Sequence, residues 1–133
     1  MDRVAIYEEI KQVVEQFNAL EPFITIDTVD WWNENVDFLE EETPFQLPAL
    51  FVEFGEIQYQ PVKGDHARGL CDMALHVVVD CSEASVQDCV SLCDRIIKSL
   101  YSRRWFMCRA RSLTNHNHAE IIECIEWVRV AVE

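Results

Sequence analysis

Glycine and proline are scarce in this 133-residue chain, which contains three glycines and four prolines. Both residues interrupt helices and strands, so their scarcity favours long regular elements with few irregular loops. The chain also lacks any apolar run approaching the ~18 residues that a membrane-spanning helix requires. With 50% hydrophobic residues, we expect a single domain over residues 1–133, with its own core and no contact with a membrane.

Positive charge is also in short supply, with 11 basic against 24 acidic residues and a net charge of −13. A nucleic-acid-binding protein needs a basic surface, so this balance argues against that class. The charges are segregated along the chain. Acidic residues crowd residues 27–42, whereas six of the eleven bases lie within residues 95–111. Two such patches can attract a second copy of the chain head to tail, or each can simply lie in water.

The apolar pattern predicts seven elements. Amphipathic helices are expected over residues 4–20 and 85–101, and strands over residues 23–29, 47–54, 70–81, 105–113 and 121–132. Consecutive short strands usually pair antiparallel. The predicted fold class is therefore α+β, with a mainly antiparallel sheet of about five strands, two helices on one face, and the order α-β-β-β-α-β-β.

Several finer features follow from the same periodicity. Gly55 separates two apolar sets of opposite parity, which predicts a β-bulge, and residues 61–69 read as a loop. In the second helix, Val86 and Val90 are expected to face inward with the two cysteines there. Alternation places Arg109 and Arg111 on the same face of their strand, and Glu126 alone interrupts the apolar face of the last strand.

The six cysteines allow more than one interpretation. Four of them fall at positions that the pattern directs inward, where reduced cysteine acts as a small hydrophobe; these are Cys71, Cys81, Cys89 and Cys93. The alternatives are a zinc set that joins the helical pair to His116 and His118, and a reactive thiol at Cys108 between two arginines. We expect core packing, with no metal and no cofactor.

Catalytic motifs are not evident. The chain has no glycine-rich phosphate loop and no Gly-x-Ser-x-Gly sequence, and the run Asn115-His116-Asn117-His118 is typical of a polar turn. Trp31 and Trp32 are adjacent, so one ring should be partly exposed, either sealing the sheet edge or binding a partner. We therefore expect a protein that is not an enzyme and that acts by assembling.

The layout resembles the tail terminator, or tail completion, proteins of long-tailed phages. The likeness lies in the N-terminal helix, the strand Leu-Pro-Ala-Leu-Phe-Val-Glu-Phe at residues 47–54, the alternating strand that leads into one long helix over residues 70–101, and the terminal strand pair. It covers nearly the whole chain and is one of pattern rather than of a single motif.

This resemblance implies a non-enzymatic protein of a phage or prophage tail, found in the bacterial cytoplasm or in the virion. Such a protein forms a homo-oligomeric ring, hexameric in the family, that caps the tail tube and joins it to the head. Its partners would be itself and the tail-tube and neck or connector proteins. We expect the ring contact, with Trp31 as a further interface residue, to join two charged groups: Asp37, Glu40, Glu41 and Glu42 of one copy, and Arg103, Arg104, Arg109 and Arg111 of the next.

A second hypothesis is a small intracellular α+β module that binds a ligand or another protein. Its candidate surface would comprise Trp31, Trp32, Tyr59 and the loop around His66.

Overall fold

The computed structural model describes residues 1–20, 24–33, 46–61, 67–115 and 120–133. It confirms the predicted α+β class and the order of elements. In chain order the elements are α1 (Arg3–Leu20), β1 (Thr28–Trp31), β2 (Ala49–Pro61), β3 (Ala67–Asp80), α2 (Val86–Leu100), β4 (Phe106–Asn115) and β5 (Ile121–Val132). No helix in these described ranges is long and apolar enough to cross a membrane.

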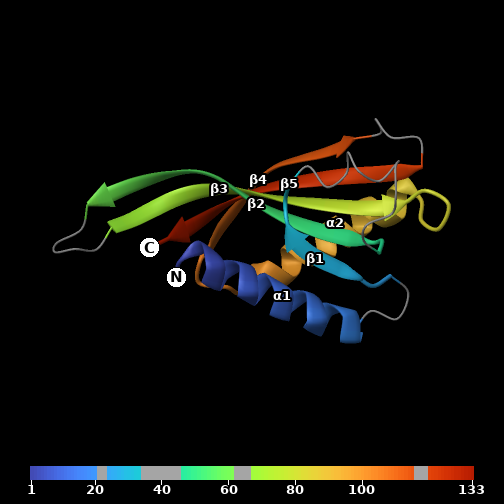
Figure 1. Cartoon of the computed structure of the whole chain (residues 1–133), viewed down its shortest axis with the longest axis horizontal. Coiled ribbons are helices and arrows are strands. Elements are labelled where there is room, and N and C mark those ends of the chain that lie inside the picture. The colour runs from blue at the N-terminus through green and yellow to red at the C-terminus, as the bar shows by residue number, and fades with distance from the viewer. Residues whose placement is uncertain (21–23, 34–45, 62–66, 116–119) are drawn as a thin grey trace.

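The five strands form one sheet in the order β1-β2-β3-β5-β4 (Figure 1). Three neighbouring pairs are antiparallel, whereas β1 runs parallel to β2. The expectation that consecutive strands pair antiparallel is therefore wrong for this pair. A parallel pair needs a connection of about a dozen residues or more, and the chain between β1 and β2 is long enough to supply one.

The first strand also begins later than predicted, at Thr28 rather than Phe23. The side chain of Asn18 in α1 explains part of this shift. Its Nδ2 atom donates to the carbonyl of Ile26 at 2.8 Å, and its Oδ1 atom accepts from the Ile26 N–H at 2.8 Å. Because the N–H of Ile26 is bonded to a helix side chain, that residue cannot donate it in a strand pair.

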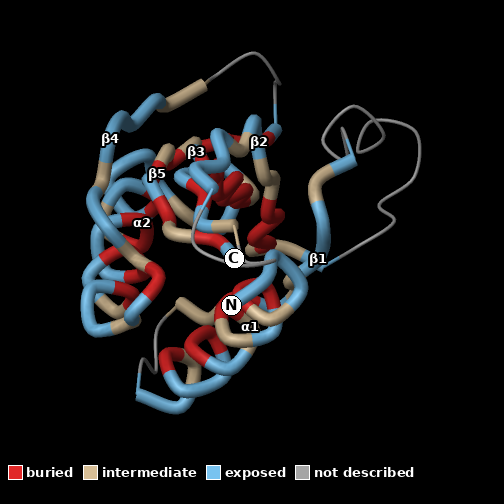
Figure 2. The backbone as a smooth tube through the Cα atoms, turned by 90° about the vertical axis from the view of Figure 1, so that its left-hand side faces the viewer, coloured by how far each residue is buried: buried red, intermediate tan, exposed pale blue. Residues whose placement is uncertain are grey.

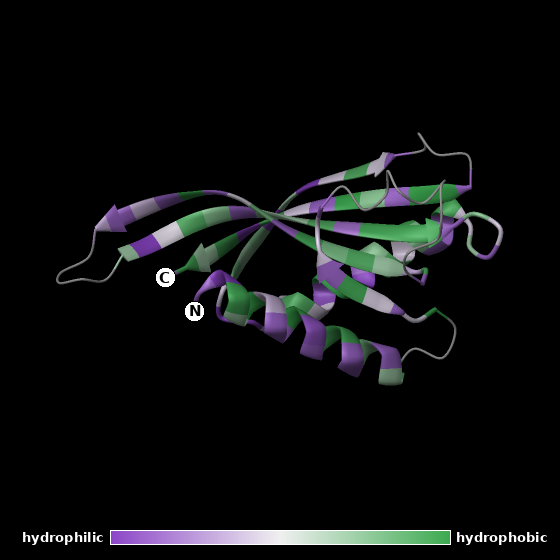
Figure 3. Cartoon of the chain, viewed as in Figure 1, coloured by the Kyte–Doolittle hydropathy of each residue, from purple (hydrophilic) through white to green (hydrophobic). Residues whose placement is uncertain are grey.

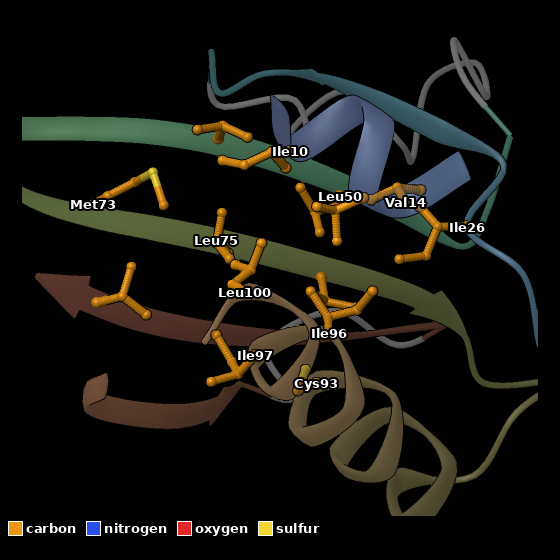
Figure 4. Packing of buried hydrophobic residues seen from close by; sticks show 14 of the residues in the cluster. Ile10, Val14, Ile26, Leu50, Met73, Leu75, Cys93, Ile96, Ile97 and Leu100 are labelled. Carbon is orange, nitrogen blue, oxygen red and sulfur yellow. The ribbon is translucent and has the colours of Figure 1, made fainter. Parts of the chain in front are cut away.

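Both helices lie on the same side of the sheet (Figure 2). We call this side the helix face and the opposite side the outer face. The main hydrophobic core fills the helix face, where Ile10, Leu50, Leu75, Ile96 and Leu100 are almost fully buried (Figure 4). Burying one such side chain contributes about 1.5–3 kcal/mol, so this layer supplies most of the apolar stabilisation.

Side chains cap the N-terminus of each helix. Asp2 accepts from the N–H of Ala5 at 2.8 Å. Ser85 and Asp88 form a capping box, in which each side chain accepts from the other residue's backbone N–H. These bonds hold the pKa of the exposed Asp88 carboxyl below its usual range. They satisfy helix N–H groups that have no partner within the helix itself.

The buried side of α2 is rotated from the predicted one. Val86 and Val90 are 42% and 41% exposed, whereas Leu92 and Ile96 are buried beside the cysteines. The helix has apolar residues over a wide arc, so several rotations are compatible with its periodicity. The observed rotation buries the two larger side chains and leaves the two valines in contact with solvent.

Strands β2 and β3 form a long hairpin (Figure 1). Its register shifts between Phe54 and Ile57, which confirms the bulge predicted at Gly55. A Cβ atom at Gly55 would lie 2.9 Å from the carbonyl oxygen of Asp72, so only glycine fits this close approach.

The predicted loop over residues 61–69 is too long. The hairpin continues to the pair Pro61 and Ala67, so the two strands extend further than the sequence pattern indicated. Strongly hydrophobic residues gather where β2 and β3 cross the helices (Figure 3). Toward the far end of the hairpin, Tyr59 and Leu70 are 53% and 45% exposed.

Candidate functional site

Strand β4 forms one edge of the sheet. It pairs with β5 on one side, and no other described strand pairs with its second side. An edge strand presents unpaired N–H and C=O groups that can accept a strand from another chain. Met107 and Leu113 on this strand are 53% and 50% exposed. The β4 edge, which we define as residues 106–115, is therefore the best candidate docking surface in the described structure.

Two irregularities in β4 separate side chains that simple alternation would group. The register with β5 shifts between Phe106 and Cys108, and again between Arg109 and Arg111. Arg109 consequently lies on the helix face, whereas Arg111 lies on the outer face. The prediction that these two arginines share a face is wrong, because an extra residue in a strand reverses the side to which later side chains point.

Arg109 is held within its own chain. Its Nε and Nη2 atoms donate to the carboxylate of Glu126 at 2.9 and 2.7 Å, and Nη2 also donates to Asp94 of α2 at 2.8 Å. Ser112 donates to the same glutamate. These contacts, chiefly the bonds to Glu126, raise the pKa of Arg109 above its usual range. They explain how Glu126, only 4% exposed, interrupts the apolar face: a buried carboxylate needs a paired cation.

The other three predicted arginines differ in their surroundings. Arg103 forms an ion pair with Glu9 of α1 at 3.2 Å, and the same carboxylate accepts from the indole N–H of Trp105 at 2.8 Å. Arg111 stacks on Trp127 on the outer face, with its Cζ atom 4.2 Å from the ring centroid. Arg104 and Arg111 are exposed. Of the four, these two can most readily reach a partner.

The acidic half of the predicted contact, Asp37, Glu40, Glu41 and Glu42, lies outside the described residues, as do His66, His116 and His118. The ring contact therefore stays a prediction.

The two tryptophans occupy opposite faces of the sheet at β1. Trp31 is 39% exposed and stacks on Tyr7 of α1 at 4.2 Å between ring centroids. This confirms that one ring of the pair is partly exposed. Burial of the Tyr7 side chain, together with the nearby charge of Asp30, raises the pKa of Tyr7. Trp31 thus closes the sheet edge above α1 and still offers part of its ring to solvent.

A buried polar cluster on the outer face was not anticipated from the sequence. The ring of His76 is 5% exposed and lies between two carboxylates. Its Nδ1 atom is 3.1 Å from Glu123 and its Nε2 atom is 3.0 Å from Glu53. Trp32 covers the imidazole in a parallel stack, with 3.7 Å between centroids and 3° between planes. Ionised carboxylates only accept hydrogen bonds, so both contacts form together only when the imidazole carries both protons.

Alternation did place His76 on the face opposite the main core, and its apolar neighbours Ala74 and Val78 were a signal that this face is also buried. The partners could not be read in the same way. Glu53 and Glu123 are 23 and 47 positions away in the chain, and only the pairing of β3 with β2 and β5 brings them to one point.

Three cysteines converge on the helix face: Cys89 and Cys93 of α2 and Cys124 of β5. The predicted burial of Cys71, Cys89 and Cys93 is confirmed, whereas Cys81 is exposed because β3 ends one residue before it. Cys108 is exposed on β4.

The buried thiols are held in the protonated form. The thiol of Cys89 donates to the sulfur of Cys124 at 3.0 Å, and this bond is the main reason that its pKa rises to about 12. The pKa of Cys93 is also raised, chiefly by its hydrogen bond with Cys124. Burial raises the pKa of Cys71 as well.

Two surface hollows lie along α2. One of about 520 Å³ lies between the helices and is lined by Val13, Phe17, Leu20, Arg95 and Lys98, among others. Another of about 430 Å³ lies along α2 and shares Arg95 and Lys98. The described residues that line these hollows include no nucleophile paired with a base.

No protein-family model matches this chain, and no curated protein matches it.

Proposed function

We propose that this protein is a non-enzymatic assembly protein that forms a homo-oligomeric ring, with the role of a phage or prophage tail terminator. The ring caps the tail tube, and its partners are further copies of itself and the tail-tube and neck proteins. The family role rests on the resemblance in element order and strand pattern described above.

The observation that carries the assembly role is the β4 edge. This ten-residue strand has one side unpaired among the described strands, and it carries two half-exposed apolar side chains. Proteins that stay monomeric usually protect such an edge with charged side chains, proline, β-bulges or a covering loop. Strand β4 has two register shifts and the exposed Arg111 but no proline. Pairing of this edge with another copy would satisfy its backbone groups and cover Met107 and Leu113.

The distribution of charge favours a contact between two different surfaces of neighbouring copies. Arg104 and Arg111 are exposed at or next to the β4 edge, and the net charge of −13 leaves ample acidic surface on each copy. A contact between a basic edge and an acidic surface is heterologous, and such contacts close into rings when the rotation between copies permits. Charge pairs at the rim of an interface set association rate and orientation more than affinity.

The test measures molar mass by light scattering after size exclusion, at about 50 mM and about 500 mM salt, because salt screens exposed charges. We expect an oligomer of defined mass that appears as closed rings in negative-stain electron microscopy. The double variant Met107→Lys/Leu113→Lys should be monomeric with unchanged circular dichroism.

The matched control is Val86→Lys/Val90→Lys, which adds two lysines at similarly exposed positions of α2 and should keep the oligomer. A monomeric wild-type protein at both salt concentrations would overturn the proposal, as would an oligomer that the β4 variant leaves intact.

A second candidate function, a ligand- or protein-binding module, is favoured by the hollow between α1 and α2 with its basic rim. Under this hypothesis the protein is a monomer. Substitution of Phe17 or Arg95 should then weaken the capture of a partner, whereas Met107→Lys/Leu113→Lys should not. Light scattering therefore separates the two functions before any partner is known.

A further inference from the structure

The three thiols on the helix face are close enough to bind one ion. Cys89 and Cys93 are separated by one helical turn, and Cys124 reaches them from β5. Their Sγ atoms all lie within 4.8 Å of one another. An ion that bonds three sulfurs at ~2.3 Å, the zinc–thiolate length, needs the sulfurs no more than about 4.6 Å apart. Only small side-chain adjustments separate the present arrangement from such a set.

The elements that carry the thiols are rigid. Cys124 lies on an interior strand of the sheet, paired with Val77 on one side and Thr114 on the other, and a capping box fixes the start of α2. Ligands on well-packed helices and strands are held near their binding geometry before the ion arrives, which lowers the entropic cost of binding.

The apolar residues around the three cysteines favour an ion that leaves the complex without net charge. The three cysteines are at most 2% exposed and belong to the main apolar cluster, together with Leu92 and Ile122. A net charge is costly in such an environment. Three thiolates carry three negative charges, so a divalent ion leaves one uncompensated and a monovalent ion leaves two. Only a trivalent ion gives a neutral complex. Zinc is disfavoured further, because structural zinc takes four ligands and the described residues bring only three together here.

We propose that Cys89, Cys93 and Cys124 form a three-thiol binding site for a trivalent thiophilic ion, for which arsenic(III) is the probe. Arsenous acid, As(OH)₃, reacts with the three thiols in a balanced exchange. Three As–O and three S–H bonds break, three As–S and three O–H bonds form, and three waters leave. No oxidation state changes, so no oxidant or reductant is required. The site is independent of ring assembly.

The experiment uses the full chain, unfolded under reducing conditions and refolded with or without arsenite, because the folded core shields the thiols. Intact mass after removal of free arsenite should show one arsenic per chain, with three hydrogens lost. X-ray absorption at the arsenic edge of the wild-type protein should show three sulfur neighbours.

The variant Cys93→Ala removes one of the three ligands. It should weaken arsenic retention by about tenfold or more, since even the loss of a group that only supports a ligand costs that much. The matched control is Cys71→Ala, which removes a cysteine that is equally buried but lies outside the cluster and should retain arsenic as the wild type does.

The proposal would be overturned if the wild-type protein retained no arsenic, or if oxygen rather than three sulfurs surrounded the bound arsenic. It would also be overturned if the Cys71 and Cys93 variants lost arsenic equally. Stoichiometric zinc that excludes arsenite from the refolded protein would overturn the charge argument and with it the site.

Discussion

Two glutamates of β5, Glu123 and Glu126, are both about 5% exposed or less, yet they lie on opposite faces of the sheet. Glu126, on the helix face, is bound by Arg109, and Glu123, on the outer face, is bound by His76. An arginine binds one carboxylate through two N–H groups, whereas a histidine can offer each ring nitrogen to a different partner. The helix face thus has a two-bond ion pair with one carboxylate, and the outer face has a histidine that bridges two carboxylates.

The largest effect is expected from breaking the pair on the helix face. The variant Arg109→Met should lower the free energy of unfolding by about 3 kcal/mol, because it leaves a buried carboxylate without its cation. The guanidinium itself is 29% exposed, which favours the lower end of the usual range. Urea unfolding followed by circular dichroism measures this loss.

The double variant Arg109→Met/Glu126→Met should regain most of that stability, since removal of both charges leaves no buried charge without a partner. The exposed Arg104→Met serves as a control and should change stability by no more than about 0.5 kcal/mol. An Arg109 variant as stable as this control would show that the pair on the helix face is unimportant.

A smaller loss is expected on the outer face. The variant His76→Leu should lower the free energy of unfolding by about 2 kcal/mol, which is less than the loss expected when a buried ion pair is fully broken. Glu123 keeps its hydrogen bond from Asn115 at 3.2 Å, and Glu53 is 44% exposed and can turn toward water. The same urea titration measures the difference.

The double variant His76→Leu/Glu123→Leu should restore the stability that His76→Leu loses. If the single and double variants are equally unstable, stacking of the imidazole on Trp32, rather than its charge pairing, stabilises this face.

The third prediction concerns the pH dependence that buried thiols give to the helix face. The pKa of Cys89 is about 12 in the folded chain against 9.0 for the free thiol, so the folded state keeps a proton that the unfolded state releases. Its stabilising contribution is complete below pH 9.0 and is lost progressively as pH rises toward 12. The slope is about 1.4 kcal/mol per pH unit for each such thiol.

The urea midpoint should therefore be lower at about pH 10 than at about pH 8. This difference should be smaller in the variant Cys89→Ala. The exposed Cys108→Ala should retain the full wild-type difference. A Cys89 variant with the wild-type pH dependence would contradict the prediction.

The fold was more predictable than the sites because local periodicity carries the fold. The Gly55 bulge and the apolar alternation of β3 each depend on neighbours within a few residues, and the structure confirms both. The parallel pairing of β1 was missed because the connection that permits it has no short-range pattern.

Side-chain partners were less predictable. The reversal of Arg109 and Arg111 depends on a bulge that no glycine marks, and the rotation of α2 depends on how it packs against the sheet. Arg109 was predicted to meet another copy of the chain, but its guanidinium is bound to Glu126 and Asp94 of its own chain.

The number, type and order of the helices and strands follow from the amino-acid pattern, since hydrophobic periodicity acts over a few residues. Which distant groups meet depends on the packing of the whole chain. This packing placed His76 between Glu53 and Glu123, Arg109 on Glu126, and Cys124 beside the two cysteines of α2. The physical reason is that strand register and helix rotation bring these groups together, and both are set by how the whole core packs.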